Sequence, residues 1–260
     1  MGKRQHYEPG VFCWTDLATT DAEGAKAFYG GLFGWEAEDR PVGDAGVYTM
    51  LSLGGDQVCA LYELDSYMRE HGVTPSWLSH VSVDSADRVA ERARGLGATA
   101  EDPFDILDAG RMTIIRDSAG AVLAAWQSHE HLGAGRVNDA GCMAWNELQT
   151  REPEEASRFY SALFGWEMER MEENSELAYV LIKNNGRMNG GIMPVPAGWD
   201  MAASWLPYFT VASCDAAVTD ARRLDGEVLV EPFEPGEGRI SVLSDPQGAA
   251  FAIFEGETDE

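Results

Sequence analysis

The 260-residue sequence is short of basic residues, and this shortage excludes two classes of partner. Only 19 lysines and arginines stand against 44 aspartates and glutamates, which gives a formal charge of -25. A surface this acidic repels the phosphates of nucleic acids and the headgroups of anionic lipids. We therefore expect no nucleic-acid partner and no membrane partner, and we expect cationic small molecules to be enriched near the protein.

Cysteines and long apolar runs are also scarce. The four cysteines, Cys13, Cys59, Cys142 and Cys214, form no CxxC pair, so they predict buried thiols rather than a disulfide framework or a zinc site. No run of 18 apolar residues occurs, and no apolar signal segment follows the first basic residues. The sequence predicts a cytoplasmic protein and leaves open whether it is a monomer or a homodimer.

Cofactor motifs are missing as well. No GxGxxG follows a strand pattern, and the chain has neither a P-loop nor a GxSxG nucleophile elbow. We therefore expect no bound cofactor. Apolar residues nevertheless make up 45% of the chain, which is enough to build packed cores.

The sequence does contain a long internal repeat. The string AFYGGLFGWE at residues 27–36 returns as RFYSALFGWE at 158–167, an offset of 131 that also relates Trp14 to Trp145. Later in the chain the offset is 128, as between Asp117 and Asp245. The repeat covers nearly the whole chain, whose length suits two ordinary domains. The expected boundaries are a first domain over 1–132, a linker over 133–140 and a second domain over 141–260.

Each copy of the repeat contains two modules with the same order of secondary-structure elements. In the first copy a strand pattern precedes a helix pattern with Asp21 as N-cap and Gly34 as its stop, and two more strand patterns follow. The expected strands are 11–19, 47–53, 57–63, 77–83, 112–117 and 120–127, with helices over 21–34 and 85–97. Each copy therefore predicts two βαβββ modules. The repeated string lies in the first helix, and we expect Phe28, Leu32 and Phe33 to pack that helix on the sheet.

These patterns resemble a known superfamily. The opening D…AFY…LFGW, the GR…DxxG turn before the last strand and the paired modules are similar to the vicinal oxygen chelate superfamily of glyoxalases, bleomycin-binding proteins and extradiol dioxygenases. The resemblance covers both halves and is nearest to the tandem two-domain actinobacterial members. It implies an α+β fold of two tandem domains, in each of which paired βαβββ modules form a curved sheet around a cup. It also implies a small-molecule ligand.

Metal-dependent members of the superfamily carry His, Gln or Glu at fixed strand positions, and this chain has other residues there. The corresponding residues are Trp14, Leu78 and Ala124 in the first half and Trp145, Leu206 and Ala252 in the second. The remaining ligand position, at the end of the first module, has no aligned residue here, and Glu63 is the carboxylate nearest to it in the sequence. The second half contains no histidine, and we expect His129 and His131 beside the linker to be solvated. Because divalent metals need several N or O donors, we expect no metal.

Strand alternation predicts which side chains line each cup. The first set is Trp14, Asp16, Leu78, His80, Val122, Ala124 and Trp126, and the second is Trp145, Glu147, Leu206, Tyr208, Ala250, Ala252 and Phe254. Each cup has an aromatic floor, small residues and one carboxylate. One interpretation is a pocket for a flat ligand stacked on tryptophan, with an amine held by Asp16. The other is a plugged cup, in which Asp16 and Glu147 pair with Arg111 and Arg239.

The two cups also differ in their candidate proton-transfer groups. His80 beside Asp16 forms an acid–base pair suited to chemistry next to a carbonyl, whereas Tyr208 and Glu147 take these places in the second half. Two functions follow. One is a metal-free protein that binds or sequesters an aromatic or cationic natural product or metabolite, in antibiotic resistance or natural-product biosynthesis. The alternative is a cofactor-independent glyoxalase-like isomerase or lyase; a purely structural pair of plugged cups is a third.

Overall fold

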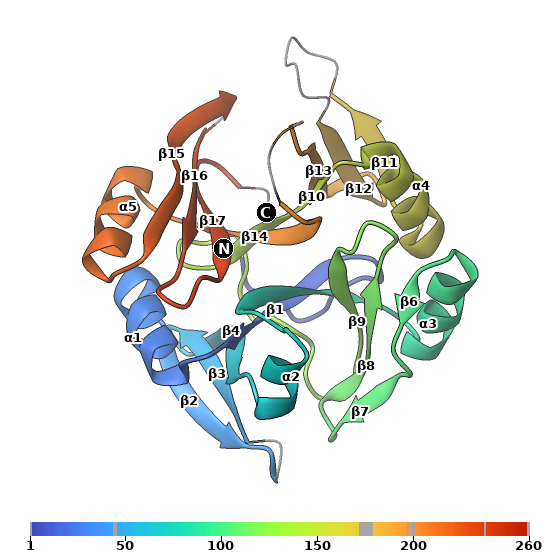
Figure 1. Cartoon of the computed structure of the whole chain (residues 1–260), viewed down its shortest axis with the longest axis horizontal. Coiled ribbons are helices and arrows are strands. Elements are labelled where there is room, and N and C mark those ends of the chain that lie inside the picture. The colour runs from blue at the N-terminus through green and yellow to red at the C-terminus, as the bar shows by residue number, and fades with distance from the viewer. Residues whose placement is uncertain are drawn as a thin grey trace.

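The computed structural model describes residues 2–43, 46–171, 179–196, 198, 201–236 and 238–258. It contains two curved sheets, one in each half of the chain (Figure 1). The elements of the first half are β1 (Phe12–Thr19), α1 (Ala22–Phe33), β2 (Glu36–Pro41), β3 (Val47–Leu53), β4 (Asp56–Glu63), α2 (Ser66–Glu70), β5 (Ser76–Ser82), α3 (Ala86–Gly95), β6 (Thr99–Ala100), β7 (Phe104–Ile106), β8 (Gly110–Arg116) and β9 (Val122–Ser128). Those of the second half are β10 (Met143–Thr150), α4 (Pro153–Phe164), β11 (Glu167–Arg170), β12 (Val180–Asn184), β13 (Arg187–Pro194), β14 (Ser204–Thr210), α5 (Cys214–Arg223), β15 (Glu227–Gly236), β16 (Gly238–Ser244) and β17 (Ala250–Glu255).

The strand order is nearly the same in both sheets. It is β2-β3-β4-β1-β5-β9-β8-β6 in the first, with β7 also on β8, and β11-β12-β13-β10-β14-β17-β16-β15 in the second. In each half the first strand pairs in parallel with the fourth strand of its own module and antiparallel with the first strand of the next module. The predicted α+β fold with two curved sheets is confirmed. The sequence patterns missed β2, β6, β7 and the short helix α2.

The ends of α1 follow from two residues. Asp21 accepts a hydrogen bond from the backbone N–H of Gly24, which satisfies a donor at the start of the helix. Gly34 ends the helix with a φ of 74°, a left-handed conformation that glycine adopts without a steric penalty. Both were predicted. Helix α4 ends in the same way at Gly165.

The helices pack across the two halves, in addition to the packing on its own sheet that was expected of α1. Helix α1 lies beside α5, and α3 lies beside α4 (Figure 1). Phe28 on α1 contacts Phe251 of the second half, and Tyr29 donates a hydrogen bond to Asp245 at 3.1 Å. Phe28 and Phe33 are buried as predicted, whereas Leu32 is only half-buried. The repeated string therefore builds the contact between the halves.

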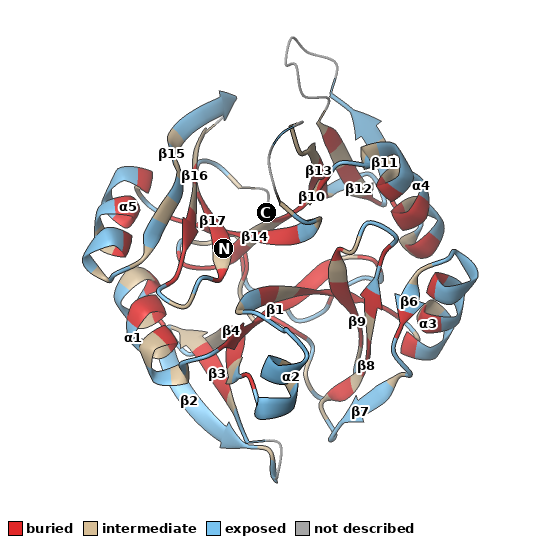
Figure 2. Ribbon diagram, viewed as in Figure 1, coloured by how far each residue is buried: buried red, intermediate tan, exposed pale blue. Residues whose placement is uncertain are grey.

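One hydrophobic core runs through both halves. Phe12 on β1 lies 5.4 Å from Trp166 and 5.2 Å from Trp205 between ring centroids. The polar Ser79 and Asn146 also meet there, and the serine hydroxyl donates to the amide oxygen at 2.6 Å. Figure 2 shows the buried residues gathered along the central strands, with exposed residues on the outer strands and helix faces. The sheets therefore meet back to back, and alternation directs the cup residues to the opposite faces.

The segment expected as a linker, 133–140, packs on the first sheet. Ala134 is buried, and its backbone N–H donates to the carbonyl of Cys13. Gly133 has a φ of 119°, and a Cβ there would come within 2.4 Å of that same carbonyl oxygen. Glycine is therefore required at this position. The four cysteines are buried free thiols, as predicted.

Among the described residues, no helix has both the length and the apolar character needed to cross a membrane.

Candidate functional site

The structure brings the predicted residues of the first cup onto one face of the first sheet. Trp14 on β1 pairs with His80 on β5, which pairs in turn with Ala124 on β9. Asp16 pairs with Leu78 in the neighbouring row. Paired residues on adjacent strands point to the same side, so these side chains converge. Trp126 lies two residues beyond Ala124 on that face.

Asp16 and His80 form a buried contact in the first cup. The Nε2 atom of His80 lies 3.2 Å from Oδ2 of Asp16, and both side chains are almost fully buried. The distance fits an ion pair, but the orientation does not meet hydrogen-bond geometry. The two side chains therefore lie in contact without a hydrogen bond between them.

Tyr48 on β3 belongs to this site and was missed by the sequence reasoning. Its hydroxyl accepts from Nε1 of Trp14 and donates to Oδ2 of Asp16, both at 3.1 Å. Burial raises the pKa of Tyr48 well above 10, and the Asp16 charge raises it further, so the phenol stays protonated as a donor. The repeat could have identified Tyr48, because Tyr48 and Tyr179 are separated by the same offset of 131 as Trp14 and Trp145.

His131 closes the first cup, which corrects the expectation that it is solvated. Its ring meets that of Trp14 edge-on, with centroids 4.5 Å apart, and its backbone carbonyl accepts from Nε1 of Trp126. Burial, with the nearby charges of His80 and Arg40, lowers the pKa of His131 to about 4. The imidazole is therefore neutral at neutral pH. Its position next to the linker gave no sequence signal for this packing.

The second cup repeats the same rows with different chemistry. Trp145 pairs with Tyr208, which pairs with Ala252, and Glu147 pairs with Leu206. Glu147 is buried and accepts hydrogen bonds from Tyr208, Gln149 and Tyr179. Burial raises the pKa of Glu147, and these hydrogen bonds oppose the rise. The carboxylate here is held by phenols, whereas the first cup has a histidine beside it.

Tyr179 takes the place of Tyr48 in the second cup. Its hydroxyl accepts from Nε1 of Trp145 at 3.1 Å. The phenol lies over Gly191, where a Cβ would come within 1.8 Å of its oxygen. A side chain at Gly191 would therefore displace the phenol from the carboxylate.

The cups differ most in exposure. Trp14 and Trp126 are buried, whereas Trp145 and Phe254 at the related positions are half-buried. Leu206, Tyr208 and Ala252 form an apolar cluster separate from the main core. Its half-buried neighbours are Trp145, Ile240, Val242, Ala250 and Phe254. The aromatic residues of the first cup are therefore covered, whereas those of the second present apolar surface to solvent.

The expected arginine partners of the two carboxylates are elsewhere. Arg111 bonds to Asp87 and Asp105 near the surface, and Arg239 bonds to Asp215. Both arginines lie near the start of their strands, β8 and β16, where they bond to carboxylates of α3, β7 and α5 instead. The interpretation that paired Asp16 and Glu147 with them is wrong.

The residues at the metal positions of the superfamily do not fit a metal centre. Trp14, Leu78 and Ala124 carry no donor for a divalent cation, and Glu63 lies at the surface, where it bonds to Arg69. Within the described part of the chain, no group of three or more His, Cys, Asp and Glu side chains is arranged to hold a metal. Asp16 and His80 alone offer two donors, fewer than a stable site requires.

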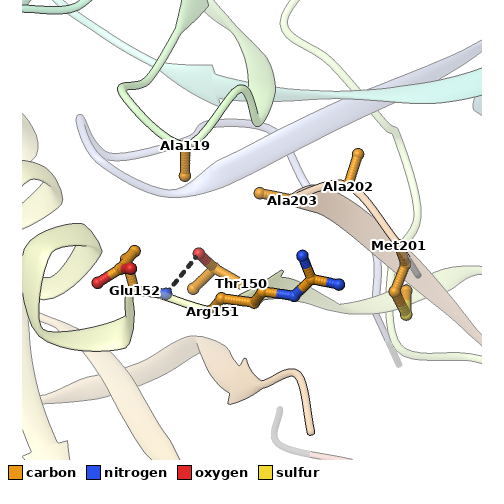
Figure 3. A pocket seen from close by; sticks show the side chains of 7 residues that line it. All are labelled: Ala119, Thr150, Arg151, Glu152, Met201, Ala202 and Ala203. Carbon is orange, nitrogen blue, oxygen red and sulfur yellow. Dashed lines mark hydrogen bonds between the residues drawn. The ribbon is translucent and has the colours of Figure 1, made fainter. Parts of the chain in front are cut away.

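A surface pocket lies away from both cups (Figure 3). It lies where the turn after β8 approaches the start of α4, and the backbone N–H of Glu152 donates to Thr150 in its wall. The lining residues are Ala119, Thr150, Arg151, Glu152, Met201, Ala202 and Ala203. None of the predicted site residues is among them.

Comparisons with known proteins agree with this geometry. Residues 11–124 match the glyoxalase/bleomycin resistance protein/dioxygenase superfamily, and residues 145–254 match a glyoxalase-like domain. The chain is 40% identical over 98% of both chains to CFP32 of Mycobacterium tuberculosis, which carries a provisional glyoxylase name. It is 32% identical to the anthracycline biosynthesis protein DnrV of Streptomyces peucetius, covering 96% of this chain and 94% of that protein.

Solved structures share the fold at low identity. The 2,3-dioxygenase LapB from Pseudomonas sp. KL28 superimposes with a TM-score of 0.66 at 13% identity, over 98% of this chain and 96% of that one. The Mn(II)-bound glyoxalase from Novosphingobium aromaticivorans gives 0.66 at 14% identity, over 100% and 84%. Together with the matched domains and the full-length relatives, these likenesses show that the chain belongs to the glyoxalase/bleomycin resistance/dioxygenase superfamily.

Proposed function

We propose that this protein binds a flat aromatic small molecule in its second cup without a metal ion. The observation that supports this most directly is the apolar cluster of Leu206, Tyr208 and Ala252, which stands apart from the main core. Its neighbours Trp145 and Phe254 are only half-buried. Apolar surface left facing solvent in a concave sheet is the usual setting of a small-molecule site. The proposed function is to hold or sequester such a ligand in natural-product metabolism.

The second cup has the parts needed to hold a ring system. Trp145 and Phe254 offer half-buried aromatic faces, on which a planar ligand gains stacking and desolvation energy. Trp145 is fixed by its hydrogen bond to Tyr179. Tyr208 lies on β14, between the strands of these two rings, and Glu147 lies two residues from Trp145 on β10. Both supply polar atoms that orient a ligand carrying carbonyl or hydroxyl groups.

The relatives support the same ligand class. DnrV and DauV of Streptomyces are named for anthracycline biosynthesis, and an anthracycline is a polycyclic aromatic compound. They are 32% and 30% identical to this chain over 96% of it. From these relatives we infer the class of ligand for this protein, a polycyclic aromatic compound, and no particular reaction.

A second candidate function is proton transfer in the first cup. Its basis is the buried contact of 3.2 Å between His80 and Asp16, the arrangement that a general base next to a carbonyl substrate requires. In this alternative the chain is a cofactor-independent isomerase or lyase. Conversion of a substrate by chelator-treated protein, lost in His80→Gln, would favour it over the binder.

Titration calorimetry with a hydroxylated anthraquinone tests the aromatic site. We expect Trp145→Ala to weaken binding by about 1–3 kcal/mol, because a stacking face is lost. The matched control is Trp126→Phe in the first cup, which should leave the affinity unchanged.

Two results would contradict the proposal. One is equal loss of anthraquinone affinity in both variants, since that would place the ligand elsewhere or make the effect structural. The other is a stoichiometric metal in elemental analysis of the purified protein whose removal by chelator abolishes binding, because the site proposed here uses no metal.

A further inference from the structure

We propose that the first cup is a closed binding site for the ammonium group of a small primary amine, with His131 as its lid. The aromatic site proposed above lies in the other cup, so each proposal can fail without the other.

Hydrogen-bonding atoms without partners converge in the first cup. They are Oδ1 of Asp16, both ring nitrogens of His80 and Nε2 of His131. Asp16 and His80 are only 6% and 3% exposed, so solvent at the surface does not satisfy them. Buried polar atoms are normally paired, and a set of them in one place indicates a missing occupant. In the second cup, by contrast, Glu147 accepts from two phenols and an amide.

The unmet atoms are suited to a donor-rich group. A carboxylate oxygen only accepts hydrogen bonds, and a neutral imidazole offers one accepting nitrogen. Oδ2 of Asp16 already accepts from Tyr48, which leaves Oδ1 for another donor. Asp16, His80 and His131 together therefore present up to three acceptors, and an ammonium group has three N–H donors.

Charge also favours a cation in the first cup. Asp16 is buried, and the titratable side chains paired with it among the described residues are His80 and Tyr48, neither of which carries a permanent positive charge. Arg40 influences His131, but it bonds to Glu38 at the surface. A buried carboxylate without a cationic partner is destabilising, and an ammonium ion would compensate it. The indole rings of Trp14 and Trp126 add attraction for a cation near their faces.

His131 is placed to open and close this site. It is half-buried, unlike Asp16 and His80, and its ring lies edge-on against Trp14. Its backbone is fixed by hydrogen bonds from Trp126 and to the carbonyl of Ala109. Rotation of this side chain, with its backbone held in place, is the movement that we propose uncovers Asp16 and His80.

The test compares propylammonium with 1-propanol, which has the same carbon chain and no charge. The readout is the NMR shift of the His80 ring in the full-length protein. We expect saturable shifts with propylammonium and much weaker ones with propanol. Asp16→Asn should weaken propylammonium binding roughly tenfold or more, because the negative charge that strengthens the hydrogen bond to the ammonium group is lost.

Controls separate a local effect from misfolding and from the other cup. Glu147→Gln in the second cup should leave propylammonium affinity within about twofold, since that cup takes no part. If Asp16→Asn does not fold, His131→Ala serves instead, with the exposed His129→Ala as its matched control. We expect His131→Ala to reduce the affinity several-fold and His129→Ala to leave it unchanged.

Three results would overturn the proposal. Equal shifts with propanol and propylammonium would mean that charge plays no part. Absence of saturation with either probe would mean that ordered water alone satisfies the polar atoms. Unchanged affinity in both Asp16→Asn and His131→Ala would place the amine elsewhere. Anthraquinone binding in the same samples reports on the second cup separately.

Discussion

The two buried carboxylates show how the same position in a repeat can acquire different chemistry. Asp16 has His80 beside it and one free oxygen, whereas Glu147 is one carbon longer and reaches the phenols of Tyr208 and Tyr179. The carboxylates and the residues beside them were predictable, because alternation along paired strands decides which side chains share a face. The tyrosines were missed because they come from a third strand, whose register the pattern does not give.

The raised pKa of Glu147 leads to a prediction about stability and pH. Because burial raises its pKa above 4.5, the folded state binds this proton more tightly than the unfolded state. This stabilising contribution is complete below the ordinary pKa and is lost as pH rises through the raised value. Glu147→Gln does not titrate. The free energy of unfolding of Glu147→Gln, relative to that of the parent, should therefore increase as pH rises from about 4.5. The increase should be at most about 1.4 kcal/mol per pH unit.

Urea denaturation at a series of pH values measures this difference. The control is Glu130→Gln, which changes an exposed carboxylate and should give a difference that does not vary with pH. Parallel stability curves for the parent and Glu147→Gln would show that Glu147 titrates alike in the folded and unfolded states.

At the scale of elements, sequence patterns located the helices better than they located their partners. An N-cap aspartate and a glycine stop are local signals, and both ends of α1 were predicted from them. The apolar face of α1 indicates which residues are buried and says nothing about which sheet covers them. Strand β2 was missed because all six of its residues are exposed, so it shows no alternation of apolar and polar side chains.

Tyr29 tests the contact that α1 makes with the second half. Its hydroxyl accepts from Nε1 of Trp77 and donates to Oδ2 of Asp245, and all three side chains are buried. Tyr29→Phe leaves that donor and that acceptor without partners. We expect the free energy of unfolding to fall by about 1–3 kcal/mol, measured by urea denaturation.

The repeat provides a second measurement of the same effect. Tyr160 links Trp205 to Asp117 in the same way, so Tyr160→Phe should lose a similar amount. The two losses should add in the double variant, because the sites share no partner. Tyr67→Phe, at a residue that is 67% exposed, is the control. Losses no larger than that of the control would mean that these hydroxyls do not hold the halves together.

At the scale of the whole molecule, the two halves share a core but not a surface chemistry. The aromatic contact of Phe12 with Trp166 and Trp205 joins the first strand to the second half. The cups lie on the opposite faces of the sheets, where the aromatic residues of the first are buried and those of the second are half-buried. A shared core with separate cups lets either cup change without loss of the fold, which agrees with the low identity of the solved structures that share it.

The shared core predicts that the chain unfolds as one cooperative unit. If one half unfolded alone, it would expose the rings that Phe12 packs against, so a half-folded state is disfavoured. Phe12→Ala should lower the free energy of unfolding by about 3–5 kcal/mol and keep a single transition. Circular dichroism and tryptophan fluorescence should then give coincident midpoints.

The control is Ile240→Ala, beside the apolar cluster of the second cup, which should lower the free energy of unfolding by clearly less. Two separate transitions in Phe12→Ala, with only one shifted from the parent, would mean that each half folds independently despite the aromatic contact.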